Sequence, residues 1–147
     1  DHTKYPDPEK RSAHGGTFTG NPVTMVAGCA TVDTLKDGVV HAHIDGLGEK
    51  MRNGLQEIFD ESKYPASVTG VGSTFGIHFQ KEKPKNAGET AKNDLEMTKV
   101  YFKYMLEQNI IYLSPTVSHS WISSPHTKED VEEYLRVTEE FMKSYKA

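Results

Sequence analysis

The most informative segment of this chain reads His14-Gly15-Gly16-Thr17-Phe18-Thr19-Gly20-Asn21-Pro22. Its glycines allow the backbone to turn and to approach a ligand where a Cβ would obstruct it. The segment ends in Asn21 and Pro22, a typical N-cap residue followed by proline at the first helical position. A glycine-rich loop that leads into a helix favours an anion, because backbone N–H groups and the helix dipole both attract negative charge. A tight loop before a capped helix, with no ligand, explains the same residues, and the segment matches neither the P-loop nor the dinucleotide fingerprint.

Apolar residues at helical spacing predict four helices along the chain. The first begins at Asn21 and ends before Gly38, and the second has apolar positions from Ile44 to Phe59. The third spans about 93–107. Thr127, with Asp130 three residues later, is a capping-box-like start for the fourth.

Between the helices the period of the pattern changes to that of β-strands. Residues 67–71 and 74–80 predict a strand pair, 110–114 a buried strand, and 118–123 a further strand. The charged stretch 81–92 is expected to be a solvated loop. Helices and strands that are segregated in this way favour an α+β layer over a parallel βαβ array. Residues 1–13 have no periodicity and are expected to form an extended arm.

Four segments resemble one enzyme family, in the same order and at similar spacing. The stretch from Gly15 to Gly28 is similar to the GGTFSGNPLxMAAG segment of the glutamate-1-semialdehyde 2,1-aminomutases, which belong to the class III aminotransferases. Gly72 to Phe79 resembles the family's GSMFxxxF strand. Tyr112 to Thr116 and Ile122 to Thr127 resemble its GVYLAPS and FLSxAHT segments. The resemblance extends from about residue 14 to the end of the chain.

The resemblance implies the type I fold of pyridoxal phosphate (PLP) enzymes. Residues 1–45 would be the tail of the large PLP-binding domain, a loop plus a helix. Residues 46–147 would be the C-terminal small domain, a small, mostly antiparallel sheet packed with helices. The resemblance also implies a homodimer that acts on a small amino-acid-like substrate. In this homodimer, the N–H of Gly16 would bind the phosphate of PLP held by the opposite subunit. Thr17 would bind the same phosphate through its N–H and its hydroxyl.

The resemblance does not extend to a catalytic lysine. In the family, the lysine that forms a Schiff base with PLP lies upstream of the GGTF segment, and no lysine here has a similar context. Lys4 and Lys10 have polar, proline-interrupted neighbours, and Lys36, Lys50 and Lys99 are expected on solvated helix faces. We therefore assign no catalytic residue and expect the isolated 147 residues to be inactive, as the C-terminal part of an aminomutase or aminotransferase. The segment from Pro115 to Trp121 also lacks the family's carboxylate, which leaves the substrate open.

The composition excludes several other classes of function. The net charge is −4 and no sustained basic stripe is present, which argues against nucleic acid. No apolar run is long enough to span a membrane. The single cysteine, Cys29, excludes an internal disulfide and fits a cytoplasmic location. His41 and His43 form an HxH pair, but no cluster of further ligands has metal-binding spacing, so no metal site is predicted.

The remaining candidate residues are expected to be structural. Cys29 lies on the apolar face of the first helix and should be in the core. For Trp121, packing is favoured over the alternative role of lining a substrate mouth. His126 is expected to be a hydrogen-bond partner near the start of the last helix. A triad of Ser123, His126 and Asp130 rests only on proximity in the sequence, and strand-to-helix geometry should separate its members. The alternative to a PLP enzyme is a stand-alone, non-catalytic α+β domain that binds a partner or an anion.

Overall fold

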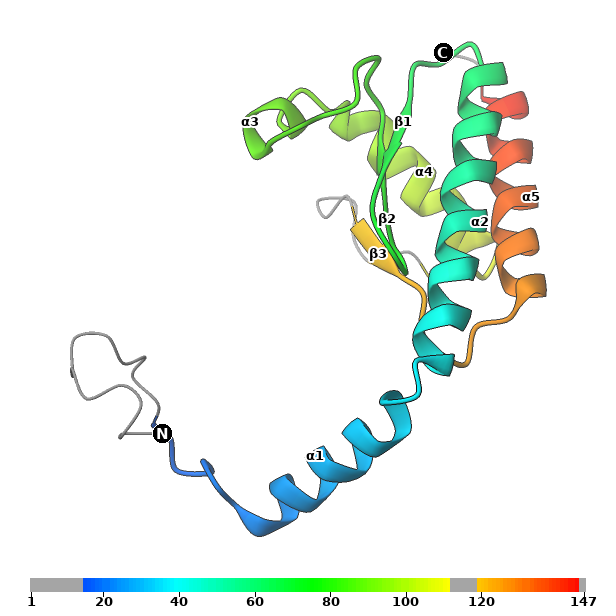
Figure 1. Ribbon diagram of the computed structural model, residues 1–147. Helices are drawn as coiled ribbons and strands as arrows, with labels where there is room; N and C mark the ends of the chain where they lie inside the picture. The colour runs from blue at the N-terminus through cyan, green and yellow to red at the C-terminus, as the bar shows by residue number, and fades with distance from the viewer. Residues whose placement is uncertain (1–14, 112–118, 146–147) are drawn as a thin grey trace. The chain divides into compact units, whose positions relative to one another are not determined.

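The computed structural model describes residues 15–111 and 119–145. The chain divides into two compact units, Asp1–Asp37 and Gly38–Ala147. Helix α1 belongs to the first unit, and the second contains the other helices and the strands (Figure 1). Their bounds are α1 Pro22–Leu35, α2 Val39–Glu61, β1 Ser67–Thr69, β2 Thr74–His78, α3 Ala87–Thr90, α4 Leu95–Glu107, β3 His119–Trp121 and α5 Lys128–Ser144.

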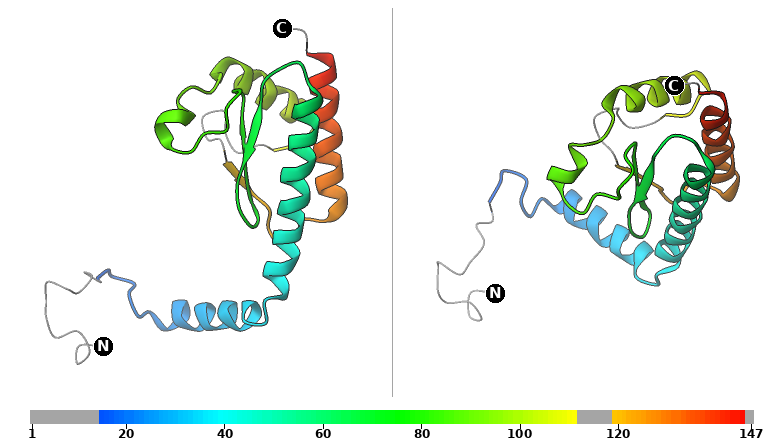
Figure 2. Two further views of the ribbon diagram at one scale, coloured as in Figure 1. Left: turned by 45° about the horizontal axis from the view of Figure 1, so that its top comes forward. Right: turned by 90° about the horizontal axis from the view of Figure 1, so that it is seen from above.

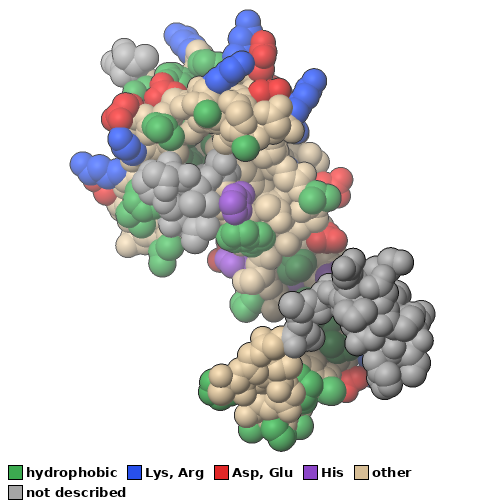
Figure 3. Space-filling model, turned by 90° about the vertical axis from the view of Figure 1, so that its left-hand side faces the viewer, with side chains coloured by type: hydrophobic (Ala, Val, Ile, Leu, Met, Phe, Trp, Pro, Cys, Tyr) green, Lys and Arg blue, Asp and Glu red, His purple; other side chains and the backbone are tan. Residues whose placement is uncertain are grey.

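Helix α1 is apolar on all sides and buries no residue within this chain. Hydrophobic side chains lie at its surface (Figure 3), among them Val23, Val26 and Val32. The expectation that Cys29 lies in the core is wrong for this chain, because the side chain is exposed. Helical spacing predicted the helix, but α1 has no polar face that would distinguish an inner from an outer side.

The sheet of the second unit has three antiparallel strands in the order β1-β2-β3. Val68 pairs with Ile77, and Phe75 pairs with Ser120. The α+β class and the mostly antiparallel sheet are therefore confirmed, as are the strand pair and the strand within 118–123. Helices α2 and α5 lie side by side in both views of Figure 2.

One hydrophobic core joins the sheet to α2, α4 and α5. Helix α2 contributes apolar residues at successive helical turns, from Leu47 to Phe59, and Leu55 is fully buried. Inside the core, the Tyr101 hydroxyl lies 2.8 Å from Thr138 Oγ1, which donates to the Tyr134 carbonyl at 2.9 Å. The buried apolar residues are Leu47, Met51, Leu55, Phe59, Val68, Phe75, Ile77, Phe79, Met97, Tyr101, Met105, Ile122, Val131, Tyr134, Val137 and Phe141.

The turn between β1 and β2 approaches α2 so closely that glycine is required on both sides. A Cβ at Gly48 would lie 2.1 Å from the carbonyl oxygen of Gly72. Gly72 itself has φ 56°, in the left-handed region that favours glycine. Arg52 then donates to the Gly72 carbonyl and, at 2.9 Å, to the Thr74 carbonyl. This contact fixes the hairpin against the middle of α2.

Two expectations of local structure need correction. The solvated loop 81–92 contains the one-turn helix α3, because the Asn86 side chain accepts from Glu89 N at 3.0 Å and starts a turn. The predicted strand at 110–114 is wrong at Ile110 and Ile111, which are in no strand. Ile111 is 90% exposed, and residues 112–114 lie outside the described residues.

Candidate functional site

The loop that precedes α1 is closed by short-range hydrogen bonds. Thr19 N donates to the Gly16 carbonyl at 3.0 Å, and Asn21 N donates to the Phe18 carbonyl at 3.1 Å. Asn21 then caps α1, since its Oδ1 accepts from Val23 N at 3.0 Å and from the next backbone N–H at 3.3 Å. The predicted N-cap is therefore confirmed, with Pro22 at the first helical position.

Two glycines are needed for this loop geometry. Gly20 has φ 77°, a conformation that L side chains rarely adopt. At Gly16, a Cβ would lie 3.2 Å from Thr19 Oγ1, which is tighter than most real contacts. A side chain at either position would therefore strain the loop or move Thr19.

The loop surrounds a wide, solvent-open hollow of about 590 Å³ beside the start of α1. Among the described residues, no hydrogen bond uses the N–H of Gly16, the N–H of Thr17 or the Thr17 hydroxyl. These three donors suit an oxyanion, and no lysine or arginine occurs between Gly15 and Leu35 to add charge. The residues that line the hollow are Gly16, Thr17, Phe18, Thr19, Gly20, Thr24 and Met25.

A comparison with known protein families identifies the family of this chain. Residues 4–132 match the class-III aminotransferases. The chain belongs to this family. The predicted resemblance is thereby confirmed, and the GGTF loop lies within the matched range.

Two similar curated proteins are named as aminomutases. The chain is 31% identical over 140 residues to the glutamate-1-semialdehyde 2,1-aminomutase of Caldicellulosiruptor saccharolyticus, covering 95% of this chain and 33% of that protein. It is 39% identical over 131 residues to glutamate-1-semialdehyde 2,1-aminomutase 2 of Lachnoclostridium phytofermentans, covering 87% and 30%. The chain thus spans about a third of the length of the curated relatives it matches.

Solved structures show the same fold. An omega-transaminase from Sphaerobacter thermophilus superposes with a TM-score of 0.72 at 27% identity, over 93% of this chain and 32% of that one. A glutamate-1-semialdehyde aminomutase from Pseudomonas aeruginosa PAO1, in complex with PMP, gives 0.78 at 23% identity, over 95% and 32%. Class III aminotransferases are PLP-dependent, and one transaminase neighbour has PLP bound.

The candidate lysines of this class III chain that the structure describes, Lys36, Lys50 and Lys99, pair with carboxylates. Lys36 pairs with Asp33 at 3.0 Å, and Lys99 pairs with Glu96 at 2.6 Å, both on exposed surface. Lys50, two-thirds buried, pairs with Glu132 and joins α2 to α5. Lys4 and Lys10 lie outside the described residues.

The histidine pair of α2 does not belong to a metal site in the described part of the chain. His41 is exposed, and His43 Nε2 lies 3.0 Å from the carbonyl oxygen of His126. Across residues 15–111 and 119–145, no three His, Cys, Asp or Glu side chains gather closely enough to hold a metal ion. In the same ranges, no helix has both the length and the apolar character needed to cross a membrane.

The structure brings Ser123 and His126 together, which corrects the expectation that they lie apart. Ser123 Oγ lies 2.9 Å from His126 Nδ1, because a tight turn joins β3 to α5. Asp130 does not join this pair, because it belongs to the capping box of α5. The predicted capping box is confirmed: Asp130 Oδ2 accepts from Thr127 N at 2.7 Å. The Thr127 bonds lower the pKa of Asp130. His126 is thus the structural hydrogen-bond partner that was expected, and no triad forms.

Trp121 differs from its expected packing role. It lies on β3 and is 54% exposed, with its ring 4.7 Å from the ring of His119 in an edge-on arrangement. Because successive side chains of a β-strand point to opposite faces, the rings of His119 and Trp121 lie on one side of β3 and Ser120 lies on the other. The sequence pattern could not show this, because the side of a three-residue strand depends on its register with β2.

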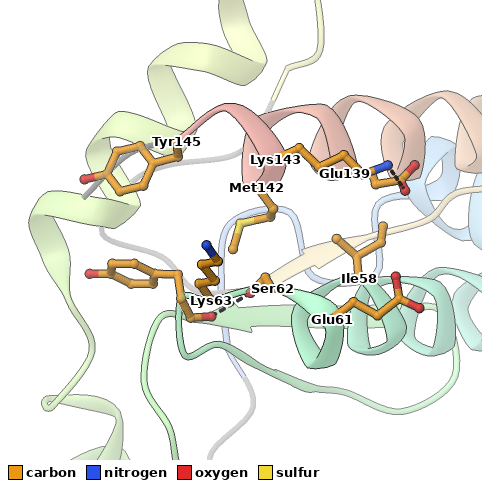
Figure 4. A pocket seen from close by; sticks show the side chains of 9 residues that line it. Ile58, Glu61, Ser62, Lys63, Glu139, Met142, Lys143 and Tyr145 are labelled. Atoms are coloured by element: carbon orange, nitrogen blue, oxygen red, sulfur yellow. Dashed lines mark hydrogen bonds and ion pairs between the residues drawn. The ribbon is translucent and has the colours of Figure 1, made fainter.

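A second hollow, of about 520 Å³, lies between the C-terminal ends of α2 and α5 (Figure 4). Two of its charged groups compensate each other, since Lys143 pairs with Glu139 across one helical turn. Ser62 Oγ donates to the Tyr64 carbonyl at 2.8 Å. These contacts explain the residues without a ligand. The lining residues are Ile58, Glu61, Ser62, Lys63, Tyr64, Glu139, Met142, Lys143 and Tyr145.

Sequence reasoning missed one polar contact that fixes the second unit. The Tyr64 hydroxyl donates to the Asp94 carboxylate, which also caps α4 by accepting from Met97 N at 2.9 Å. The bond to Asp94, followed by burial, raises the pKa of Tyr64 to about 12. Asp94 before an apolar run is a recognisable cap signal, but its tyrosine partner is thirty residues away in the sequence.

Proposed function

We propose that this chain is the C-terminal part of a PLP-dependent aminomutase or aminotransferase that acts on a small amino-acid-like substrate in the cytoplasm. Membership of the class III family and the names of the similar proteins support this proposal. We propose further that the full-length protein is a homodimer in which Gly16 and Thr17 bind the phosphate of PLP held by the opposite subunit. The observation behind this assignment is the set of free donors in a loop with preset geometry.

The residues of the loop fit a phosphate group. When bound, PLP supplies the electron sink that stabilises negative charge on the substrate carbon. This chain would contribute two backbone N–H groups and one hydroxyl, which orient the phosphate and accept no proton from it. The start of α1 adds the positive end of a helix dipole near the hollow. The absence of a cation in the loop means that other groups of the holoenzyme would have to neutralise the phosphate.

The chain itself would provide no Schiff-base lysine, so we propose that the isolated 147 residues are catalytically inactive. The domain boundary, 1–45 against 46–147, belongs to the same proposal. The choice between aminomutase and aminotransferase depends on the full-length enzyme. There, exclusive turnover of glutamate 1-semialdehyde would assign the aminomutase reaction, and turnover of another amino donor would assign transamination.

The test of the phosphate role is the substitution Thr17→Val in the full-length dimer. Valine keeps the shape of threonine and removes the hydroxyl. A hydrogen bond to a charged group contributes about 1.5–3 kcal/mol, so the dissociation constant for PLP should rise roughly ten- to a hundredfold. PLP dissociation is followed by absorbance, and dimer dissociation is measured with and without PLP.

Thr19→Val is the matched control, because it removes a hydroxyl from the same loop at a residue to which the proposal assigns no phosphate contact. This variant should change PLP affinity much less. Equal losses in the two variants, or unchanged affinity in a folded Thr17→Val dimer, would contradict the assignment.

A separate experiment addresses the stand-alone alternative. The 147-residue chain is incubated with PLP and reduced with borohydride, and labelled lysines are identified by mass spectrometry. No lysine should be labelled stoichiometrically. Stoichiometric labelling of one lysine together with turnover of an amino donor would show that this chain has a complete catalytic centre.

A further inference from the structure

The segment from Gln80 to Asn93 forms a loop whose two ends are bonded to each other. Phe79 N donates to Asn93 Oδ1 at 2.6 Å, and Asp94 N donates to the Phe79 carbonyl at 3.1 Å. Asn93 Nδ2 donates to Thr98 Oγ1 at 2.9 Å, which anchors this base to α4. Compact surface loops with closed ends are frequently functional.

Hydrogen bonds inside the loop give it a defined shape. Gln80 Nε2 donates to the Glu82 carbonyl at 2.7 Å. Glu89 Oε2 accepts from Lys85 N at 2.8 Å, and its Oε1 accepts from Asn86 Nδ2 at 2.8 Å. The Glu89 carboxylate is therefore occupied by donors of the loop itself. The loop, which contains α3, projects beside the sheet on the side away from α2 and α5 (Figure 1).

The loop carries cations that are not neutralised by the described part of the chain. It contains four lysines and two glutamates, a formal charge of +2 in a chain whose net charge is −4. These lysines are exposed, and within residues 15–111 and 119–145 none of them forms an ion pair. Lysines outside the loop do form such pairs, for example Lys103 with Glu107 at 3.8 Å. The four lysines of the loop are Lys81, Lys83, Lys85 and Lys92.

The residue types of the loop favour carboxylates over nucleic-acid phosphates. No arginine and no aromatic residue occurs between Phe79 and Tyr101. Nucleic acids are typically bound by arginine forks and by aromatic rings on which bases stack. Glu82 is also exposed between two of the lysines, where it would repel a continuous phosphate backbone. A short acidic peptide segment can place single carboxylates beside the lysines and avoid Glu82.

We infer that the loop is a docking surface for an acidic segment of a partner protein, bound by its four lysines. Exposed ion pairs are individually weak, so the loop acts mainly by attracting and orienting the partner, and salt weakens the contact. Because the loop is already closed by its own hydrogen bonds, binding does not have to order it. The inference concerns this chain alone and does not depend on PLP binding.

The experiment measures binding of a fluorescein-labelled oligoglutamate peptide to the 147-residue chain by fluorescence anisotropy. The peptide should bind at about 0.01 M salt and much more weakly at about 0.15 M, because the Debye length falls from about 30 Å to about 8 Å. In the double variant Lys83→Gln/Lys85→Gln, the dissociation constant at low salt should rise roughly three- to tenfold. Glu82→Gln removes an exposed negative charge from the loop and should tighten binding.

Lys103→Gln/Lys128→Gln is the matched control, because it removes the same charge from two exposed lysines that already pair with carboxylates. Its affinity for the peptide should stay close to that of the unsubstituted chain. Equal losses in the two double variants, or no binding at low salt, would overturn the inference. Tighter binding of an oligouridylate of the same length, lost in Lys83→Gln/Lys85→Gln, would also overturn it, since the loop would then bind nucleic acid.

Discussion

The contact between α2 and the β1–β2 turn predicts opposite effects for the same substitution at two positions of one helix. Gly46 and Gly48 both lie inside α2, where alanine is favoured over glycine by about 1 kcal/mol. At Gly46 a Cβ would meet nothing within 4 Å. Gly46→Ala should therefore stabilise the chain by about 1 kcal/mol.

At Gly48 the same methyl group meets a backbone that cannot easily move. Its Cβ would lie 2.1 Å from the Gly72 carbonyl oxygen and 2.9 Å from Ser73 Cα. The turn is fixed by Arg52 and by the bond from Ile122 N to the Ser73 carbonyl, at 3.0 Å. Overpacking costs about 1–3 kcal/mol, and a weakened arginine bond adds about 1.5–3 kcal/mol. After subtracting about 1 kcal/mol for the gain in helix propensity, Gly48→Ala should destabilise the chain by about 1.5–5 kcal/mol.

The assay is urea denaturation of the two variants and the unsubstituted chain, followed by far-UV circular dichroism. The midpoints should move in opposite directions, with little change in the slope at Gly46→Ala. If Gly48→Ala were as stable as Gly46→Ala, the close approach of α2 and the turn would be refuted.

The other predictions concern the core and the tyrosine–carboxylate contact. Leu55→Ala removes a fully buried side chain and should cost about 3 kcal/mol, which lowers the Tm in calorimetry by roughly 10 °C or more; a shift of only a few degrees would contradict its central position. The pKa of Tyr64 is raised to about 12, so the stability gained from its neutral form is complete below about pH 10 and is lost as the pH rises through about 12. The pKa of Asp94 is lowered by the bonds from Met97 N and Tyr64, so its contribution is present above about pH 4 and is lost as the pH falls further. In Asp94→Asn, the ultraviolet titration of the Tyr64 phenolate should shift back toward about pH 10, and an unchanged midpoint would exclude Asp94 as the cause.

Local signals in the sequence predicted the structure where the controlling contacts are local. Asn21 and Thr127 start helices through bonds to residues at most three positions away, so their side chains were sufficient to place both caps. The alternation of apolar residues likewise predicted β1 and β2. The candidate loop was found from its glycines and from Asn21 and Pro22, whereas the roles of Gly16 and Thr17 came from the resemblance to the family.

The sequence was insufficient where the outcome depends on distant partners. Cys29 was expected in the core, but α1 is apolar on every side and none of its residues is buried. The register of β3 with β2 places Trp121 on the exposed side of the sheet. A pattern of only three residues cannot fix that register. The close approach of Gly48 and Gly72 brings together positions that are 24 residues apart in the sequence. A glycine within a helix can occur for many reasons, so Gly48 alone did not predict this contact.

The closure of the loop before α1 affects the thermodynamics of any ligand it receives. The bonds at Gly16, Phe18 and Asn21 hold the backbone of the loop in one shape through contacts between neighbouring residues. Conformational entropy has therefore been lost before an anion arrives, and binding need not order these residues again. A loop of this kind can be presented as a preorganised unit across a subunit boundary, where each residue left to be ordered would weaken association.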